Sequence, residues 1–272
     1  MQPHTVVAQV PITTRPAHSV TTFAAPARGI DRTRPPVWPR SRDIHLWCFD
    51  ISLPTSDAES VLDADERSRA ARFVFAHDRR RYLSAHMQMR QVLGAYLDQS
   101  PDVLHFFAGP HGKPALSQQH SRGTAELRFN LSHSGDYALL VLSSGHEVGV
   151  DIEMLRPGVA GLGLAAEVLS PQELQTLSSL PPTVADTFFL NGWTRKEAVL
   201  KALGCGLSRE PRDLTVGLDR QRRWLQLDLD QPAIEVVSFD FQPDCAAAVA
   251  MIGGVAGLEI LQGASCARGW PH

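Results

Sequence analysis

Cysteine is scarce in this sequence, and long apolar runs are missing from it. The four cysteines, Cys48, Cys205, Cys245 and Cys266, stand far apart and form no CxxC pair. This spacing suggests neither a cysteine-based zinc site nor a disulfide framework, and it favours a reducing, cytoplasmic environment. No apolar run approaches the roughly 20 residues that a membrane-spanning helix requires. We therefore expect a chain that does not span a bilayer and has no membrane partner.

Positive charge is not in excess either. The 272 residues include 26 Lys and Arg against 29 Asp and Glu, which gives a net charge of -3. Binding that depends on phosphate neutralisation needs a basic field, so the charge balance argues against nucleic acid as a partner. With 43% hydrophobic residues, the chain is long enough for one large domain or two small ones.

Acidic residues are nearly absent from residues 1–42, where Asp31 is the only one among seven prolines and six arginines. Transit peptides have such an acidic-poor composition. A disordered extension or an over-long gene start is favoured instead, because the prolines would break an amphipathic helix. We expect residues 1–42 to be dispensable and order to begin near Ile44.

The first half reads as a strand, two helices and a meander. The strand is "IHLWCFDISL", and the first helix lies in "LDADERSRAARFVF". The second helix is capped by Asp78 and ends before Pro101, since its apolar residues recur at helical spacing. After the Gly/Pro loop "AGPHGKPAL", the stretch "NLSHSGDYALLVLSSGHEVGVDIEML" predicts three strands joined by tight turns.

The second half again places helices before strands. Ser170 and Glu173 form a capping-box pattern with Pro171 at the first helical position, and a longer helix through "TFFLNGWTRKEAVLKAL" ends at "GCGLS". Three strands follow in "WLQLDLD", "AIEVVSFDF" and "AAAVAMI". This order predicts an α+β fold rather than a parallel βαβ sheet. We divide the chain into residues 1–42, 43–145 and 146–272.

Asp151 and Glu153 are the first candidate functional residues. They stand two apart on a predicted strand, so their carboxylates share one face, opposite Val148, Val150 and Ile152. Like charges this close raise each other's pKa unless a cation lies between them. A solvent-facing acidic strand is the simpler alternative.

A third carboxylate stands on the long helix. Trp193, Glu197 and Lys201 follow at intervals of four, which stacks them on one helix face. Such a Glu–Lys pair is commonly a surface ion pair, but apolar neighbours argue against full exposure. Glu197 joining the two strand carboxylates would suit Mg²⁺ or Mn²⁺, which prefer oxygen ligands and also bind substrate phosphates.

Basic and hydroxyl side chains supply candidate phosphate contacts. Lys113 lies on the turn "GPHGKP", which is not a Walker A motif, and Ser132 and His133 precede the turn "SGD" without a triad partner. The arginines between Arg67 and Arg81 are either a solvated helix face or a site for a phosphorylated ligand or acidic partner. A third interpretation, a nucleic-acid contact, rests on this cluster alone.

Taken in order, "ERSRAARF", "DRRRYLSAHMQMR", "GKP", "FNLSHSGDYALLVL", "VGVDIE" and "WTRKEAVLKALGCGLS" resemble the phosphopantetheinyl transferases of the large, surfactin-synthetase-activating type. The likeness runs from about Leu62 to Ser208. It implies two similar α+β halves about a pseudo-twofold axis, with coenzyme A bound between them. It also implies Mg²⁺-dependent transfer of 4′-phosphopantetheine to a serine of an apo acyl or peptidyl carrier protein, by a monomeric enzyme.

The resemblance assigns a role to each candidate residue. Asp151, Glu153 and Glu197 match the metal ligands, and Lys201 matches the lysine that assists the leaving group. Contacts to coenzyme A are implied for Arg69, Lys113, Ser132 and His133. Glu66 departs from the pattern, because some members carry a lysine there.

Two alternatives stay open on the sequence. Either Glu197 or a metal-ordered water accepts the proton of the carrier serine. A non-catalytic coenzyme A or nucleotide-binding module with the same fold is the competing function, although Asp151, Glu153, Glu197 and Lys201 are all present.

Overall fold

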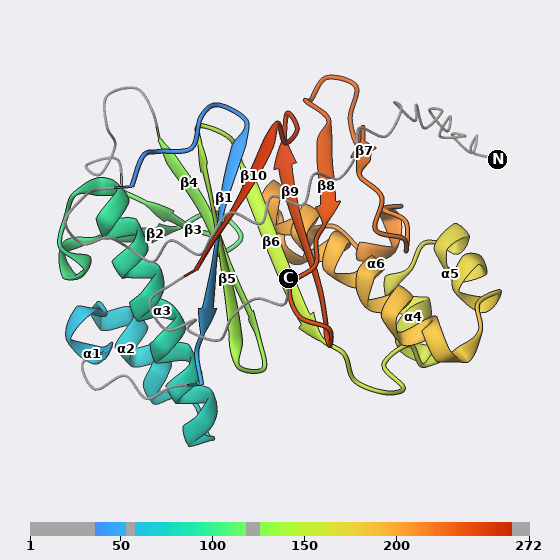
Figure 1. The fold of residues 1–272 in the computed structure, drawn as a ribbon, viewed down its shortest axis with the longest axis horizontal. Helices are drawn as coiled ribbons and strands as arrows, with labels where there is room; N and C mark the ends of the chain where they lie inside the picture. The colour runs from blue at the N-terminus through green and yellow to red at the C-terminus, as the bar shows by residue number, and fades with distance from the viewer. Residues whose placement is uncertain (1–35, 53–57, 118–125, 263–272) are drawn as a thin grey trace, which may run out of the picture.

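The chain folds into four layers, with a long helix on each outer side and two β-sheets between them (Figure 1). The computed structural model describes residues 36–52, 58–117 and 126–262. The outer helices are α3 (Ala76–Leu97) and α6 (Pro182–Leu203), each 22 residues long. The predicted α+β class is confirmed.

Each sheet has four strands. In spatial order, the first contains β10 (Gly257–Gln262), β1 (Asp43–Asp50), β5 (Tyr137–Ser144) and β4 (Leu127–Ser134). The second contains β6 (Val148–Met154), β9 (Cys245–Ile252), β8 (Ile234–Ser238) and β7 (Arg223–Leu225). Strands β4 and β6 are therefore both edge strands.

The hydrophobic core fills the space between the two sheets. Because strand side chains alternate, Leu46 and Val141 from the first sheet meet Val148, Val150 and Ile152 from the second, all with no exposed surface. The opposite face of the first sheet packs against α3, and that of the second sheet packs against α6. This leaves the other face of β6, with its carboxylates, directed toward α6.

The pairing of β6 differs from the predicted meander. Strands β4 and β5 pair with each other, but β6 pairs with β9 and opens the second sheet. Strand β10 was not predicted. It returns to the first sheet and pairs in parallel with β1, starting at Asp43 opposite Gly257, and so covers an edge that would otherwise expose unpaired backbone groups. The sheets are therefore not divided cleanly at residue 146.

The helices of the first half are close to their predicted bounds. Helix α2 (Ala64–Ala71) begins with a capping box of Asp63 and Glu66 but ends before the segment Phe73–Phe75. Helix α3 ends before Pro101 as predicted. The prediction that Asp78 caps α3 is wrong, since Asp78 lies in the first turn and Phe75 occupies the N-cap position.

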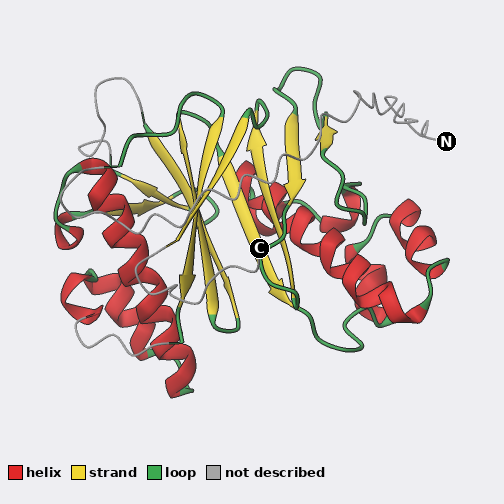
Figure 2. Ribbon diagram, viewed as in Figure 1, coloured by secondary structure: helices red, strands yellow, loops and turns green. Residues whose placement is uncertain are grey.

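Short elements fill the connections (Figure 2). The predicted Gly/Pro loop forms a hairpin of β2 (Phe106–Ala108) and β3 (Pro114–Leu116). The capping box of Ser170 and Glu173 on α5 (Pro171–Ser178) is confirmed. The others are α1 (Ala58–Val61), η1 (Pro101–Val103), α4 (Leu162–Val168), η3 (Gly206–Ser208) and η4 (Pro211–Asp213).

Residues before residue 43 contribute to the fold. Trp38 packs against the core and donates a hydrogen bond from Nε1 to the carbonyl oxygen of Tyr96 at 2.8 Å. Arg42 accepts a backbone hydrogen bond from Ala256 at 2.7 Å. Residues 36–42 thus belong to the folded body, whereas residues 1–35 lie outside the described residues. Within the described part, no helix combines the length and the apolar character needed to cross a membrane.

Candidate active site

The carboxylate face of β6 is covered by the backbone of α6. A Cβ atom on Gly149 would overlap the carbonyl oxygen of Ala198 and the amide nitrogen of Ala202. Only glycine at position 149 therefore allows α6 to pack this closely against β6. The helix fills the space beside Gly149. It thereby brings Lys201 next to Asp151, the following residue on that face of the strand.

Lys201 is the cation beside the strand carboxylates in this structure. Its Nζ lies 2.6 Å from Oδ1 of Asp151 and 3.1 Å from Oγ of Ser132. Ser132 in turn donates to the same Oδ1 at 2.9 Å. Asp151 is only 3% exposed, whereas the Lys201 side chain is 28% exposed. Lys201 therefore lies between the buried carboxylate of Asp151 and the solvent.

Polar side chains of β4 fasten the free edge of β6. The amide of Val150 donates to Oδ1 of Asn130 at 3.0 Å, and that of Met154 donates to Oγ of Ser134 at 3.1 Å. Ser134 also donates to Oε2 of Glu153 at 2.9 Å. These contacts satisfy backbone groups at an edge of β6 that no strand pairs with, and they hold Glu153 in place.

The roles of Asn130 and Ser134 were missed from the sequence. Asn130, Ser132 and Ser134 alternate along β4 and so lie on one face of it, which was the available signal. Ser132 and His133 were treated as a pair, but the same alternation places them on opposite faces. Only Ser132 contacts Asp151.

Negative charge is costly at this site. Burial raises the pKa of Asp151, although Lys201 opposes the shift. Burial is also the main reason why the pKa values of Glu153 and Glu197 are raised, and Asp151 raises both further. The three carboxyl groups thus lie within electrostatic reach of one another, and a bound cation would relieve their repulsion.

One carboxylate oxygen of the cluster is available to bind a metal ion. Oδ2 of Asp151 is buried and has no hydrogen-bond partner among the described residues, although buried polar atoms are nearly always satisfied. Three carboxylates are the hard oxygen donors that Mg²⁺ and Mn²⁺ prefer. Within the described part of the chain, no three His, Cys, Asp or Glu side chains already converge as a ligand group. The donor chemistry fits a divalent cation, with Lys201 beside Oδ1 in this structure.

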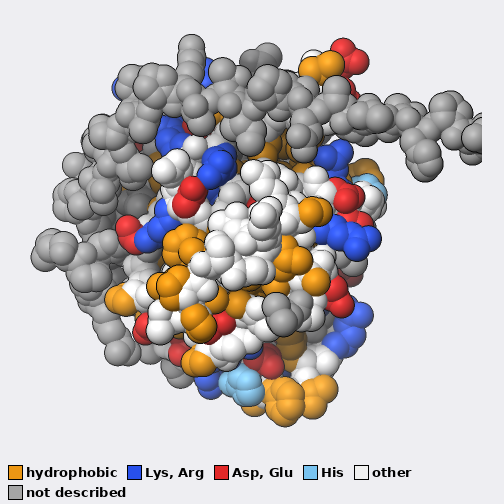
Figure 3. Space-filling view, turned by 90° about the vertical axis from the view of Figure 1, so that its right-hand side faces the viewer, with side chains coloured by type: hydrophobic (Ala, Val, Ile, Leu, Met, Phe, Trp, Pro, Cys, Tyr) orange, Lys and Arg blue, Asp and Glu red, His pale blue; other side chains and the backbone are white. Residues whose placement is uncertain are grey.

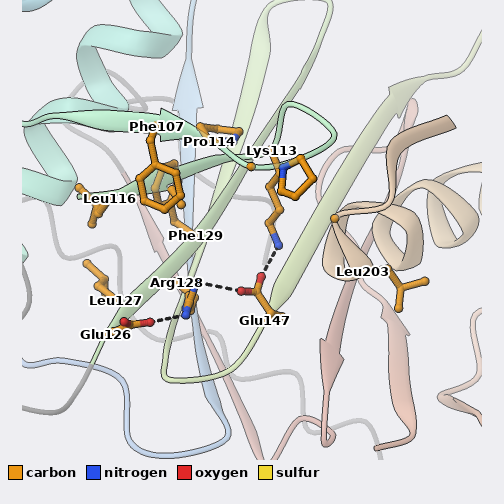
Figure 4. A pocket seen from close by; sticks show the side chains of 14 residues that line it. Phe107, Lys113, Pro114, Leu116, Glu126, Leu127, Arg128, Phe129, Glu147 and Leu203 are labelled. Carbon is orange, nitrogen blue, oxygen red and sulfur yellow. Dashed lines mark hydrogen bonds and ion pairs between the residues drawn. The ribbon is translucent and has the colours of Figure 1, made fainter. Parts of the chain in front are cut away.

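Lys113 borders a pocket of about 330 Å³ between the β2–β3 hairpin, β4 and the end of α6 (Figure 4). Its Nζ lies 2.6 Å from Oε2 of Glu147 and donates to the carbonyl oxygen of Val148 at 2.9 Å. Arg128 points to the same Glu147 at 3.0 Å. Burial lowers the pKa of Lys113, although Glu147 opposes this effect. Lys113 therefore ties the hairpin to β6 at the polar wall of the pocket.

Two family models match successive parts of this chain. The model described as 4′-phosphopantetheinyl transferase, N-terminal, covers residues 54–145. That of the 4′-phosphopantetheinyl transferase superfamily covers residues 147–250. The 4′-phosphopantetheinyl transferase HetI of Nostoc sp. is 34% identical over 216 residues, which make up 78% of this chain and 89% of the relative. The chain belongs to the 4′-phosphopantetheinyl transferase superfamily.

Other phosphopantetheinyl transferases are similar over shorter parts. The human L-aminoadipate-semialdehyde dehydrogenase-phosphopantetheinyl transferase is 30% identical over 68% of this chain and 62% of its own length. AcpT of Escherichia coli O157:H7 is 38% identical over 42% of this chain and 55% of its own length. These relatives and the family models identify the chain as an enzyme, a phosphopantetheinyl transferase.

The remaining candidates lie on the α3 side of β4. Tyr82 links them: Arg69 approaches its hydroxyl group, and its ring stacks on His86 at 4.0 Å. Desolvation, followed by the charges of His86 and Lys201, lowers the pKa of His133. Arg69, Tyr82 and His86 are thus linked in turn, and His133 lies on the neighbouring strand β4 within electrostatic reach of His86.

Glu66, where the transferase pattern differs, has a structural role. Its carboxylate accepts hydrogen bonds from Nε of Arg90 at 2.7 Å and contacts Nδ1 of His86 at 2.8 Å. Arg90 is completely buried and also pairs with Asp63 at 2.7 Å. A lysine at position 66 would leave the Arg90 guanidinium with one carboxylate fewer. Glu66 is therefore explained by its ion pair with this buried arginine.

A further buried ion pair involves α6 of this transferase. Lys196 and Glu173, 1% and 3% exposed, approach to 2.7 Å. Glu173 also accepts hydrogen bonds from the amides of Val216 and Gly217 at 2.7 and 2.8 Å. Because Lys196 precedes Glu197, this pair fixes the rotation of α6 about its axis. Sequence reasoning gave Glu173 only a capping role and Lys196 none.

Proposed function

We propose that this transferase moves the 4′-phosphopantetheine group of coenzyme A to a serine hydroxyl of an apo acyl or peptidyl carrier protein. The observation that carries the proposal is that the buried Oδ2 of Asp151, beside two further carboxylates with raised pKa values, has no hydrogen-bond partner in the described part of the chain. Asp151, Glu153 and Glu197 would hold a divalent cation, Mg²⁺ or Mn²⁺.

Coenzyme A would lie across the edge strand β4. Its nucleotide and phosphates would contact Lys113, Ser132 and His133, with Arg69 near the 3′-phosphate. In support, Ser132 and Lys201 already share Oδ1 of Asp151, so groups that bind phosphate and metal converge at one point. The chemistry would take place there, because the diphosphate must reach both.

The reaction exchanges the phosphoanhydride bond of coenzyme A for a phosphoester bond to the carrier serine. The serine oxygen bonds to the phosphorus that carries pantetheine, and the bond from that phosphorus to adenosine 3′,5′-bisphosphate breaks. When bound, the cation would neutralise charge that grows on the diphosphate oxygens. Lys201 would supply a second positive charge to the departing phosphate.

The serine proton needs an acceptor. Burial and the neighbouring carboxylates raise the pKa of Glu197, which makes it a stronger base than a solvated glutamate. Either Glu197 or a metal-ordered water would take the proton. Glu197 would also ligate the cation. We thus assign a part in proton acceptance to Glu197 and stabilisation of the leaving group to Lys201.

We further infer that the chain is of the large, surfactin-synthetase-activating type, with two halves about a pseudo-twofold axis. Successive family segments over residues 54–145 and 147–250 support this. So does the equal length of α3 and α6, each of which covers a four-stranded sheet. We further propose that the enzyme is a cytoplasmic monomer without nucleic-acid or membrane partners.

Nucleotide release distinguishes catalysis from simple binding. The wild type is incubated with coenzyme A, Mg²⁺ and an apo acyl carrier protein, and adenosine 3′,5′-bisphosphate is followed by chromatography. We expect its formation to require all three and to be lost on replacing Lys201 with Met. Binding of coenzyme A without any nucleotide release from several apo carriers would support the non-catalytic module instead.

A further inference from the structure

The corner between α2 and α3 exposes three consecutive apolar side chains. Phe73, Val74 and Phe75, here called the Phe73–Phe75 corner, are 38%, 89% and 61% exposed. Single exposed apolar residues are common, but a run of three needs an explanation in a water-exposed segment. The ring of Phe73 contacts Tyr82 at 5.3 Å and that of Phe75 stacks on His77 at 5.6 Å, so the corner is ordered.

Local stability does not account for these residues. Phe75 is the N-cap residue of α3 and makes no side-chain cap hydrogen bond with the described residues. A serine or aspartate there would stabilise the helix by roughly 0.5–2 kcal/mol. An exposed phenylalanine at a position that favours a polar cap indicates a surface with another use.

The corner carries unpaired positive charge. Arg72 and Arg80 flank it, are exposed, and form no ion pair with any described residue. By contrast, Arg79 and Arg81 are paired with Glu59 and Asp136. On a chain with a net charge of -3, two guanidinium groups that no described carboxylate pairs with, beside apolar side chains, favour a partner that is apolar and acidic.

The corner lies at the same end of the molecule as the carboxylate site. Arg81, six residues after Phe75 and so about 9 Å along the helix, donates to Oδ1 of Asp136 at 2.9 and 2.7 Å. Asp136 belongs to the turn that follows Ser134, which binds Glu153. A protein whose serine reaches Asp151 would therefore cover this region.

The α4–α6 side presents a different surface. Its hydrophobic side chains are interspersed with acidic as well as basic ones (Figure 3). Such a mixture gives no preference for the sign of a partner's charge. The Phe73–Phe75 corner, with Arg72 and Arg80, does give one.

We propose that the Phe73–Phe75 corner, with Arg72 and Arg80, is a docking surface for the carrier protein, which presents an apolar patch bordered by carboxylates. This inference rests on the proposed transferase reaction. Phe75 and Val74 insert into the apolar patch, and the two arginines attract the carboxylates around it. The corner contributes to carrier affinity and has no part in coenzyme A binding or the chemical step.

Steady-state transfer to an apo acyl carrier protein tests the assignment. We expect Phe75→Ser to raise the KM for the carrier about tenfold, the scale of an interface aromatic, with kcat and the KM for coenzyme A within twofold. Arg80→Glu should lower kcat/KM for the carrier and weaken its dependence on salt. Leu229→Ser and Arg212→Glu are matched controls, since Leu229 is 80% exposed and Arg212 lies on the α6 side of the sheets.

The outcomes separate this inference from the proposed reaction. If the wild type transfers the group and Phe75→Ser leaves the KM for the carrier unchanged at an unaltered melting temperature, the docking assignment is wrong. A change in oligomeric state by sedimentation, with carrier kinetics unchanged, would identify the corner as a contact between copies instead. Absence of transfer by the wild type would overturn the reaction itself.

Discussion

Replacing Asp151 with Asn removes one charge and little else. The amide keeps the shape of the carboxyl group, which is 3% exposed and lies on the α6 face of β6. Removing one partner of a buried ion pair usually costs about 3–5 kcal/mol, because the other charge is left buried. Here the side chain of Lys201 is 28% exposed, so its ammonium group can stay hydrated. We expect the free energy of unfolding of the metal-free variant to lie within about 1 kcal/mol of that of the wild type, or to exceed it.

The effect on stability has a defined pH dependence. A carboxyl group with a raised folded pKa binds more protons in the native state, so its charged form opposes folding as pH rises. Burial raises the pKa of Asp151 above its ordinary value of 3.8. The free energy of unfolding of the wild type thus falls as pH increases from about 4 through the raised pKa. Asp151→Asn has no carboxyl group at this position and does not show this fall. The stability of the variant relative to the wild type should increase over that window.

Activity should respond in the opposite way. If Asp151 holds a divalent cation, its loss should reduce transfer at least about a hundredfold, the effect of removing one preorganised electrostatic group. This corresponds to about 2.7 kcal/mol in the activation free energy, at 1.36 kcal/mol for each factor of ten. Mg²⁺ with coenzyme A should raise the melting temperature of the wild type and hardly affect the variant.

Urea unfolding in EDTA from pH 4 to 8, together with melting curves in Mg²⁺ and coenzyme A, measures both effects. A variant that gains as much from Mg²⁺ as the wild type would show that Asp151 is not a ligand. A variant that loses stability relative to the wild type as pH rises would show that Asp151 is a net stabilising charge, contrary to its burial.

Three further variants test neighbouring parts of the site. Lys113→Ala should raise the KM for coenzyme A more than it lowers kcat, since a uniform phosphate contact acts in the ground state and the transition state alike; a fall in kcat alone would refute this role. Ser134→Ala should weaken Mg²⁺ binding about 10–100-fold by releasing Glu153, and unchanged affinity in calorimetry would show that the hydrogen bond does not orient the ligand. Trp38→Ala should lower the free energy of unfolding by roughly 1–3 kcal/mol, because the indole packs on the core; an unchanged urea midpoint would place residues 36–42 outside the cooperative fold.

Patterns with a single physical meaning could be read from the sequence. Alternation along "VGVDIEM" predicted which side chains of β6 enter the core, and Val148, Val150 and Ile152 are indeed fully buried. The helical spacing of Glu197 and Lys201 correctly placed both on one face, and Gly204 ends the helix in the left-handed conformation with φ of 62°. These features depend on local geometry.

Features that depend on long-range pairing could not be predicted. Nothing local to β6 indicates that it pairs with β9, about a hundred residues later, or that β10 returns to β1. The Lys113–Glu147 and Lys196–Glu173 pairs span 34 and 23 positions in sequence, and either lysine alone looks like a solvated surface residue. The contact between Lys201 and Asp151 likewise depends on α6 crossing β6 at Gly149.

The most direct test of the proposed reaction is the intact mass of the acceptor. An apo acyl carrier protein and an apo peptidyl carrier domain are each incubated with the transferase, coenzyme A and Mg²⁺, beside versions in which the acceptor serine is alanine. We expect at least one intact carrier to gain the mass of a single phosphopantetheine group and its alanine version to gain none. Unchanged masses for all carriers, with a correctly folded transferase that binds coenzyme A, would contradict it.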